Sequence, residues 1–451
     1  MARMTSWLRR GWLFTACCWA WLGSGCSSEA LDADKGETGG TSDGGESEPG
    51  SGGRPANGGM ANAGANTGGR TNTGGSGDLP DYSTSECYGK PRSTLIYSGE
   101  THMTSELVAA CRGETSRVRV YVADDLFGTR VTQQEINGFL HRYELIGSEK
   151  SFRPDLGVLP TDEAVFGALS PGLIDGDKLP IFVIDTQNAG DGYLCSWCSG
   201  AELHLDGTAL DPLSGDTALS IAAHESFHAI HRGYDPNELM WVDETLAEAA
   251  MSVNGYYTDR AVLNDYARNP NINWGPARSD ISDYHYGAGL AFGTWLWEFG
   301  GEELMRAITS NTANSWAGID AALEATGHAQ TGLDAFLEMA AALYLDAPER
   351  GYGFDTFDLV DGVTVEELAA GASVSGTLQP FGLVYYAVGE GIRSLRVEAG
   401  TSVRGRLLAA TNPVELTPIE LGADLEVPAD GRVLILTAAS NSTAEYTVTV
   451  P

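Results

Sequence analysis

Two neighbouring segments decide the fold: Thr217–His231, TALSIAAHESFHAIH, and Trp241–Val253, WVDETLAEAAMSV. In both, apolar residues recur every three or four positions, which is the spacing of a helix with one buried face. The short segment Gly233–Asn237 between them contains Gly, Asp, Pro and Asn and is typical of a turn. The sequence therefore predicts two helices that follow each other closely and return across a turn. The apolar face of the first consists of Leu219, Ala223, Phe227 and Ile230.

The first predicted helix carries the pattern His-Glu-x-x-His at His224, Glu225 and His228. Side chains four positions apart lie one above the other on a helix, so both imidazoles can reach one Zn²⁺ ion. Glu225 is then placed to accept a proton from the water that the zinc activates. The plain alternative is a pair of surface histidines with Glu225 as a solvated charge.

The second predicted helix begins Trp-Val-Asp-Glu-Thr-Leu-Ala at Trp241. A His-Glu-x-x-His helix followed by this pattern resembles the gluzincin metallopeptidases, in particular the hyicolysin-like bacterial secreted peptidases. The resemblance implies that Glu244 is the third zinc ligand and Glu225 the general base. It also implies that Glu248 hydrogen-bonds a zinc-bound histidine, His224 being the expected partner, with a surface glutamate as the alternative. His231, on the same helix as the motif, ranks below Glu244 as a ligand.

The resemblance extends loosely over residues 117–310. Glu202–Asp206 corresponds in place to the edge strand that pairs with an extended peptide substrate in these enzymes. The segment Tyr284–Gly289 is similar to their Tyr-Gly-Ala helix. It implies that Tyr286, or after it His285, holds the developing oxyanion, packing at a helix start being the alternative. Asp243 stands where the family more often has Asn.

The N-terminal residues 1–26 have the organisation of an export signal. Arg3, Arg9 and Arg10 precede the apolar run Gly11–Leu22, which is too short to span a bilayer permanently. Small residues then lead to Cys26, as at a bacterial lipoprotein cleavage site. We expect lipidation of Cys26 and a membrane-anchored lipoprotein facing the outside or the periplasm. Free secretion after ordinary signal-peptidase cleavage and a retained membrane anchor are the alternatives.

Residues 27–80 form a predicted tether. They contain 16 glycines and no Val, Ile, Phe, Tyr or Trp. Such a composition cannot bury enough apolar surface to offset the entropy of ordering the chain. We expect a disordered Gly/Ser-rich segment between the anchor and the folded part.

Four cysteines remain after residue 26, and an exported chain favours disulfides between them. Three pairings are possible, and the simplest joins Cys87 to Cys111 and Cys195 to Cys198. Cys195 and Cys198 also form a Cys-x-x-Cys pair. Redox catalysis and a zinc ribbon are less favoured for it, because a strand-like run follows and a second such pair is absent.

The remaining pattern predicts an α+β fold. We expect a zinc-binding catalytic subdomain at residues 81–254, with a small β-sheet and the zinc helix, followed by a helical subdomain at 255–370. From residue 371 to 451 short alternating runs and turn residues predict an all-β sandwich. Its expected strands are Ser373–Leu378, Gly382–Val388, Ser394–Ala399, Val403–Ala409, Arg432–Ala438 and Tyr446–Val450.

Charge excludes one class of function and leaves two. The chain has 61 acidic and 27 basic residues and a net charge of −34, so we expect no nucleic-acid partner. The expected function is that of an exported zinc-dependent endopeptidase acting on peptides or proteins, attached to the membrane through Cys26. The alternative is a surface-anchored binding or adhesion lipoprotein on a catalytically degenerate peptidase fold.

Overall fold

The computed structural model describes residues 79–451, apart from residues 175–177, 196, 257–259, 276–282, 360–361 and 429–431. The predicted signal, the lipidation site Cys26 and nearly all of the predicted tether lie outside these residues. Within the described part of the chain, no helix is long and apolar enough to cross a membrane.

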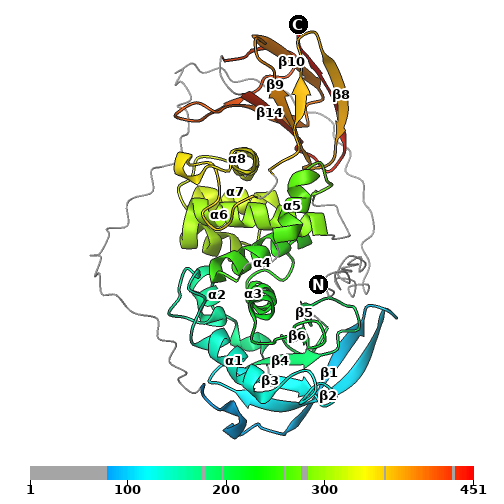
Figure 1. The fold of residues 1–451 in the computed structure, drawn as a ribbon, viewed down its shortest axis with the longest axis vertical. Helices are drawn as coiled ribbons and strands as arrows, with labels where there is room; N and C mark the ends of the chain where they lie inside the picture. The colour runs from blue at the N-terminus through cyan, green and yellow to red at the C-terminus, as the bar shows by residue number, and fades with distance from the viewer. Residues whose placement is uncertain are drawn as a thin grey trace, which may run out of the picture. The chain divides into compact units, whose positions relative to one another are not determined.

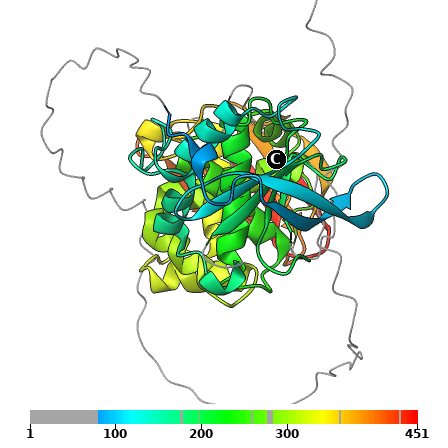
Figure 2. The same cartoon turned by 90° about the horizontal axis from the view of Figure 1, so that it is seen from below.

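The first sheet has the strand order β1-β2-β3-β4-β6-β5 (Figure 1). Strands β3, β4 and β6 are parallel, and the other neighbours are antiparallel. Every residue of β4 is buried, as its uninterrupted apolar sequence predicts. Figure 2 shows the β1–β2 hairpin extending beyond the rest of the sheet. The strands are β1 Pro91–Ser98, β2 Met103–Glu114, β3 Val118–Ala123, β4 Leu179–Ile184, β5 Gly192–Leu194 and β6 Leu203–Asp206.

The prediction that Glu202–Asp206 is the edge strand is wrong. Strand β6, which occupies most of that segment, lies between β4 and β5, and β5 forms the edge. Strand β5 has only three residues, too few to show the alternation by which a strand is recognised in sequence.

The helices of the N-terminal half are α1 Gln133–Glu144, α2 Val158–Phe166, α3 Asp216–His231 and α4 Met240–Asn254. Helices α3 and α4 are the two segments predicted from the motif region; α3 has one additional residue at its start, and α4 has one at each end. Helix α4 ends where Gly255 adopts a left-handed conformation with φ of 67°.

Further along the chain lie α5 Arg260–Arg268, α6 Asp283–Thr309, α7 Trp316–Ala325 and α8 Gly332–Leu345. Helix α4 lies between α3 and α6 (Figure 1). The backbones of α4 and α6 approach so closely at Gly293 that a Cβ atom there would collide with the Thr245 carbonyl oxygen. This contact brings the first turns of α6 alongside the helix that carries Glu244.

Two sheets make up the C-terminal region, in the orders β13-β10-β15-β8 and β12-β11-β14-β9-β7. Their facing side chains form one hydrophobic core, including Leu395 and Val448 from the first sheet and Leu407 and Leu434 from the second. The region is therefore a β-sandwich, and the predicted α+β class is confirmed. The strands are β7 Glu366–Leu368, β8 Ser373–Leu378, β9 Leu383–Val388, β10 Ser394–Ala399, β11 Val403–Ala409, β12 Glu415–Pro418, β13 Asp424–Glu426, β14 Arg432–Ala438 and β15 Ala444–Thr449.

The outer face of the second sheet packs against the helices. Tyr385 on β9 and Ile435 on β14 belong to the same hydrophobic core as the helical subdomain. The Tyr385 hydroxyl donates to the Ala340 carbonyl on α8 at 3.1 Å. The backbone N–H of Trp274 donates to the Pro380 carbonyl at 2.8 Å. The sandwich therefore shares buried surface with the helical region.

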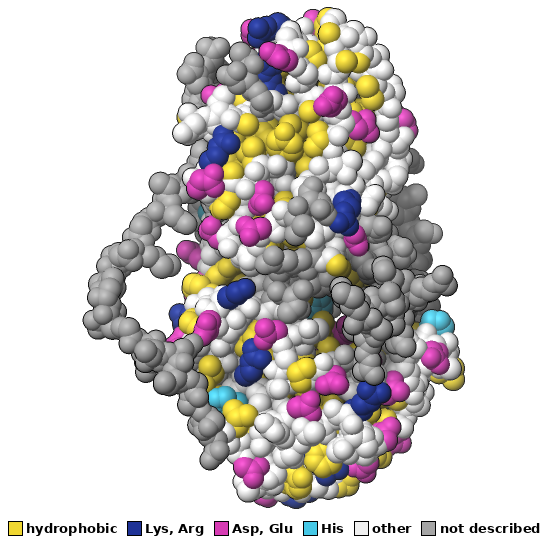
Figure 3. Space-filling view, viewed as in Figure 1, with side chains coloured by type: hydrophobic (Ala, Val, Ile, Leu, Met, Phe, Trp, Pro, Cys, Tyr) yellow, Lys and Arg dark blue, Asp and Glu magenta, His cyan; other side chains and the backbone are white. Residues whose placement is uncertain are grey.

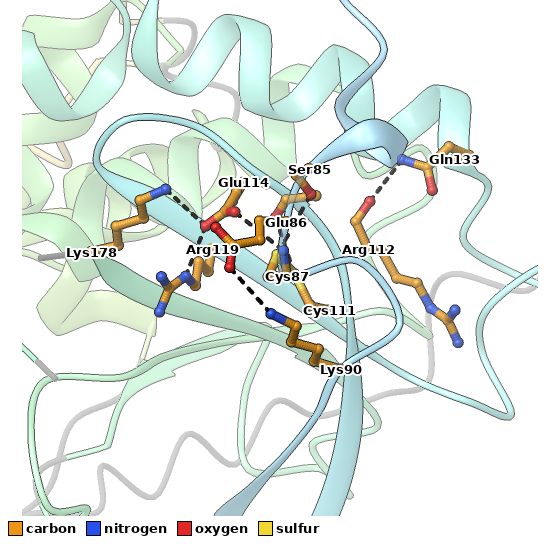
Figure 4. The surroundings of a disulfide bond; sticks show 11 residues. Ser85, Glu86, Cys87, Lys90, Cys111, Arg112, Glu114, Arg119, Gln133 and Lys178 are labelled. Carbon is orange, nitrogen blue, oxygen red and sulfur yellow. Dashed lines mark hydrogen bonds and ion pairs between the residues drawn. A yellow bond between two sulfur atoms is a disulfide. The ribbon is translucent and has the colours of Figure 1, made fainter. Parts of the chain in front are cut away.

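Both disulfides of the simplest pairing are present. One joins Cys87 to Cys111 across 24 positions, and the other joins Cys195 to Cys198 across three. The first ties the start of the described chain to β2 (Figure 4).

A partly buried ion-pair cluster lies beside the first disulfide (Figure 4). The Glu114 carboxylate accepts hydrogen bonds from Lys178 Nζ at 2.7 Å and from Arg119 Nε at 2.9 Å. It also accepts one from the Cys87 backbone N–H at 3.3 Å. Burial opposes the ionisation of Glu114, but the two cations lower its pKa to about 2.

Candidate metal centre and active site

Helices α3 and α4 bring His224, His228 and Glu244 together. One possible ligand atom of each lies within 4.8 Å of the others. The two Nε2 atoms are 3.1 Å apart, and Glu244 Oε2 lies 3.2 Å from the first and 3.8 Å from the second. Around a tetrahedral zinc ion with bonds of roughly 2.0–2.1 Å, neighbouring ligand atoms are about 3.3 Å apart. Two of the observed separations are close to that value, and the one between Glu244 and His228 is longer.

Carboxylates behind the histidines orient their rings. Glu248 Oε1 lies 3.2 Å from His224 Nδ1, which is the contact that the resemblance implies. Asp243 Oδ2 lies 2.8 Å from His228 Nδ1. Because an ionised carboxylate can only accept, the hydrogen of each ring is expected on Nδ1. Each Nε2 then presents a lone pair toward the centre.

Three acceptor atoms therefore converge without a donor between them. Glu244 Oε2 is buried and has no hydrogen-bond partner among the described residues. Such a group of lone pairs repels itself unless a cation or a proton lies between its members. Two imidazole nitrogens and one carboxylate oxygen are a donor set that suits zinc, with a fourth position left for water or substrate.

The pKa values of the two histidines reflect the negative charge around them. Burial lowers the pKa of each, but the neighbouring carboxylates outweigh burial. Glu244 and Glu248 hold the pKa of His224 well above its usual value. Asp243 and Glu244 raise the pKa of His228 to about 9. The centre thus attracts positive charge.

Glu225 lies at the same centre with an exposed fraction of only 6%. Burial raises the pKa of its carboxyl, although His224 and His228 partly offset that effect. The backbone N–H of Leu194 donates to the Glu225 carboxylate. A glutamate with a raised pKa beside a metal centre suits proton transfer near neutral pH.

The edge strand β5 passes directly beside Glu225. Its ladder with β6 is flanked by two backbone hydrogen bonds, from Cys195 N–H to Glu202 O and from Asp206 N–H to Asp191 O, both 2.8 Å. In an antiparallel pair, alternate residues direct their N–H and C=O groups toward the partner strand. Leu194 therefore directs its backbone groups away from β6, toward the side where Glu225 lies.

Tyr286, at the start of α6, lies beside the metal centre. The centroid of its ring is 6.1 Å from that of His224. His285 Nε2 instead lies 3.0 Å from the backbone oxygen of Asn273. Of the two predicted oxyanion residues, Tyr286 is the one that the structure places in contact with a proposed ligand.

Asp243 and His231 lie beside the predicted ligands, and the sequence predicts no role in the metal centre for either. Asp243 contacts both His228 and His231, with its Oδ1 2.6 Å from His231 Nδ1. Burial opposes ionisation of Asp243, but the two histidines hold its pKa far below the usual range. A sequence signal for this contact exists. His228 and His231 are three positions apart on one helical face, and an acidic residue directly precedes Glu244 in the next helix.

Charged side chains are spread over the surface without a single dominant basic region on the face shown in Figure 3. Acidic and basic groups are interspersed there among the described residues. This face offers no continuous basic track for a phosphate backbone.

No protein-family model matches the chain, and no curated protein matches it. Among solved structures, the chain is similar to PliG, a periplasmic inhibitor of g-type lysozyme. The Aeromonas hydrophila protein is 15% identical, with 20% of this chain and 96% of that chain covered and a TM-score of 0.16. The Salmonella Typhimurium protein is 10% identical, with 20% and 98% covered and the same TM-score. A mutant of the Escherichia coli protein is 14% identical, with 19% and 97% covered and a TM-score of 0.16.

Proposed function

We propose that the protein is a zinc-dependent endopeptidase. The observation that carries the proposal is the convergence of His224, His228 and Glu244 on one point, with the Glu225 carboxylate at the same centre. A binding protein has no need for Glu225 in that position. Hydrolysis by an activated water needs both a cation and a nearby base.

The side chains divide the work of hydrolysis. When bound, zinc would polarise the scissile carbonyl and lower the pKa of the attacking water. Glu225 accepts the proton of that water and then donates it to the leaving amine. Tyr286, beside His224, is the candidate donor to the oxygen that develops negative charge.

The substrate is a peptide chain in extended form. Strand β5 is the edge of the sheet, the position at which an extended chain can be added as a further strand. Because the Leu194 N–H contacts Glu225, a peptide lying along β5 has its backbone close to the general base. This placement suits cleavage within a chain and therefore an endopeptidase.

We further propose that the enzyme is exported and anchored to the membrane through a lipid on Cys26. The two disulfides support an oxidising compartment. Free secretion after signal cleavage remains the alternative location.

Metal analysis tests the proposal directly. The purified full chain should hold one zinc equivalent and hydrolyse a quenched peptide pool, and a chelator should remove both zinc and activity. His228→Gln should lose zinc, whereas the control His102→Gln, at an exposed position, should retain it. A protein that binds no zinc would contradict the proposal. Tight zinc without hydrolysis of any peptide would favour the binding and adhesion alternative.

A further inference from the structure

A second group of potential metal ligands lies outside the proposed active centre. It consists of Cys195, Cys198 and His204, and one ligand atom of each lies within 4.8 Å of the others. Cys195 follows β5 directly, and His204 lies in β6 opposite Tyr193. In the structure the two sulfur atoms are joined as a disulfide.

His204 is a buried histidine with one unpaired ring nitrogen. Its exposed fraction is 0%, and its Nδ1 has no hydrogen-bond partner among the described residues. Its Nε2 lies 3.0 Å from Thr94 Oγ1, and that hydroxyl donates to Glu202 Oε2 at 2.6 Å. Among the described residues, the imidazole therefore forms hydrogen bonds through Nε2 alone.

Neighbouring groups complete the surroundings of the three ligands. Thr94 Oγ1 also lies 3.8 Å from Cys198 Sγ, so one hydroxyl contacts both the imidazole and a sulfur. Glu202 Oε2 lies 3.8 Å from His204 Nε2 and is the nearest carboxylate for a fourth position. Arg92 Nη2 pairs with the other Glu202 oxygen at 2.8 Å and balances its charge.

We propose that Cys195, Cys198 and His204 form a second metal site, for zinc or a similar thiophilic cation, which becomes available when the disulfide is reduced. Two thiolates and one neutral imidazole neutralise a divalent cation and leave one position for Glu202 or water. A dithiol reductant supplies two electrons and two protons: the S–S bond breaks, two S–H groups form, and the reductant becomes its own disulfide. The cation then displaces the two thiol protons into solvent.

The second site has a consequence for the neighbouring strand. The cation would tie the chain after β5 to β6 through His204. Leu194, which contacts Glu225, immediately precedes Cys195. Under reducing conditions the metal would therefore hold the end of β5 to β6, next to the residue that contacts Glu225.

Cobalt substitution of the full chain tests this site separately from the proposed peptidase function. The first centre contains no sulfur, so a thiolate-to-cobalt charge-transfer band reports only the second. The oxidised protein should bind one cobalt equivalent without that band. After anaerobic reduction and removal of the dithiol, it should bind a second equivalent and show the band. Peptidase activity is not part of the readout, so loss of the proposed function leaves this result interpretable.

Variants assign the band to the named residues. Cys195→Ser/Cys198→Ser and His204→Gln should each lose the second equivalent, whereas Cys87→Ser/Cys111→Ser should retain it. Circular dichroism checks that each variant is folded. The proposal is overturned if reduced wild-type protein, in which Cys87, Cys111, Cys195 and Cys198 titrate as thiols, still binds one equivalent. It is also overturned if the band persists in Cys195→Ser/Cys198→Ser.

Discussion

Asp243 joins two histidines of α3 through one carboxylate. Its Oδ2 lies 2.8 Å from His228 Nδ1, and its Oδ1 lies 2.6 Å from His231 Nδ1. A carboxylate held at both oxygens has a fixed orientation, so it also fixes the imidazole of His228. Its negative charge increases the basicity of that imidazole and so strengthens the bond to a metal.

Asp243→Asn should therefore weaken zinc binding. An amide has only one accepting oxygen and no charge, so it cannot hold both histidines in the same way. We expect zinc affinity to fall about 10- to 100-fold, as measured by competition with a chromogenic chelator. Asp155→Asn, at an exposed position, is the matched control. An unchanged affinity in Asp243→Asn would mean that Asp243 does not support His228.

At this scale, the sequence is informative where spacing along one helix is enough. His224, Glu225 and His228 can be identified in that way, because the two histidines are four positions apart on one helix and Glu225 lies between them. Glu244 required a family resemblance, because its approach to the histidines depends on how α4 returns. The link from Asp243 to His231 depends on the rotation of α4 about its axis, which the sequence does not specify.

Among the elements, β2 and β3 are linked by the ion-pair cluster at Glu114. Its side chain is 11% exposed, and its pKa is lowered to about 2 from 4.5. A lowered carboxyl pKa stabilises the fold above the unfolded pKa, and that contribution is lost as the pH falls from 4.5 toward 2.

Glu114→Gln should thus destabilise the protein at pH 7 and much less at pH 2–3. The shift in pKa corresponds to about 3 kcal/mol at neutral pH as an upper estimate. Urea unfolding of wild type and variant at a series of pH values measures the difference. Glu106→Gln, an exposed position on the same strand, should show no such trend. A difference that stays constant down to pH 2 would refute the explanation.

The elements themselves differ in how far the sequence reveals them. The alternation of polar and apolar residues in Ser394–Ala399 predicts a strand with the bounds that β10 has, because the two faces of that strand lie in different environments. Strand β5 has three residues, and its position at the edge depends on pairing with β6, which is a tertiary contact. Helix α6 is kinked at Gly301, whose φ of 60° and ψ of −159° are not helical, so two helical segments meet there.

On the scale of the whole molecule, the β-sandwich is joined to the helices by a shared core. Successive residues of β14 face opposite ways: Leu434 belongs to the sandwich interior, and Ile435 belongs to the core that includes the helices. Both are 0% exposed. A sheet buried on both faces is expected to unfold together with both of its neighbours.

Calorimetry of the full chain should therefore show a single transition for the described region. Leu434→Ala and Ile435→Ala should each cost about 2–5 kcal/mol and lower the temperature of that same transition. The two variants form a matched pair, since they differ only in the face that loses its side chain. Two separate transitions, with Leu434→Ala shifting one of them alone, would show that the sandwich is an independent domain.

We propose that Glu225 transfers a proton at a zinc centre formed by His224, His228 and Glu244. The direct measurement is kcat/KM of Glu225→Gln on a quenched peptide, with zinc content determined on the same sample. We predict one retained zinc equivalent and a loss of about 10²–10⁴-fold in kcat/KM, because the base is removed and the ligands stay. Glu324→Gln, exposed on α7, is the control. Undiminished hydrolysis by zinc-loaded Glu225→Gln would contradict the claim.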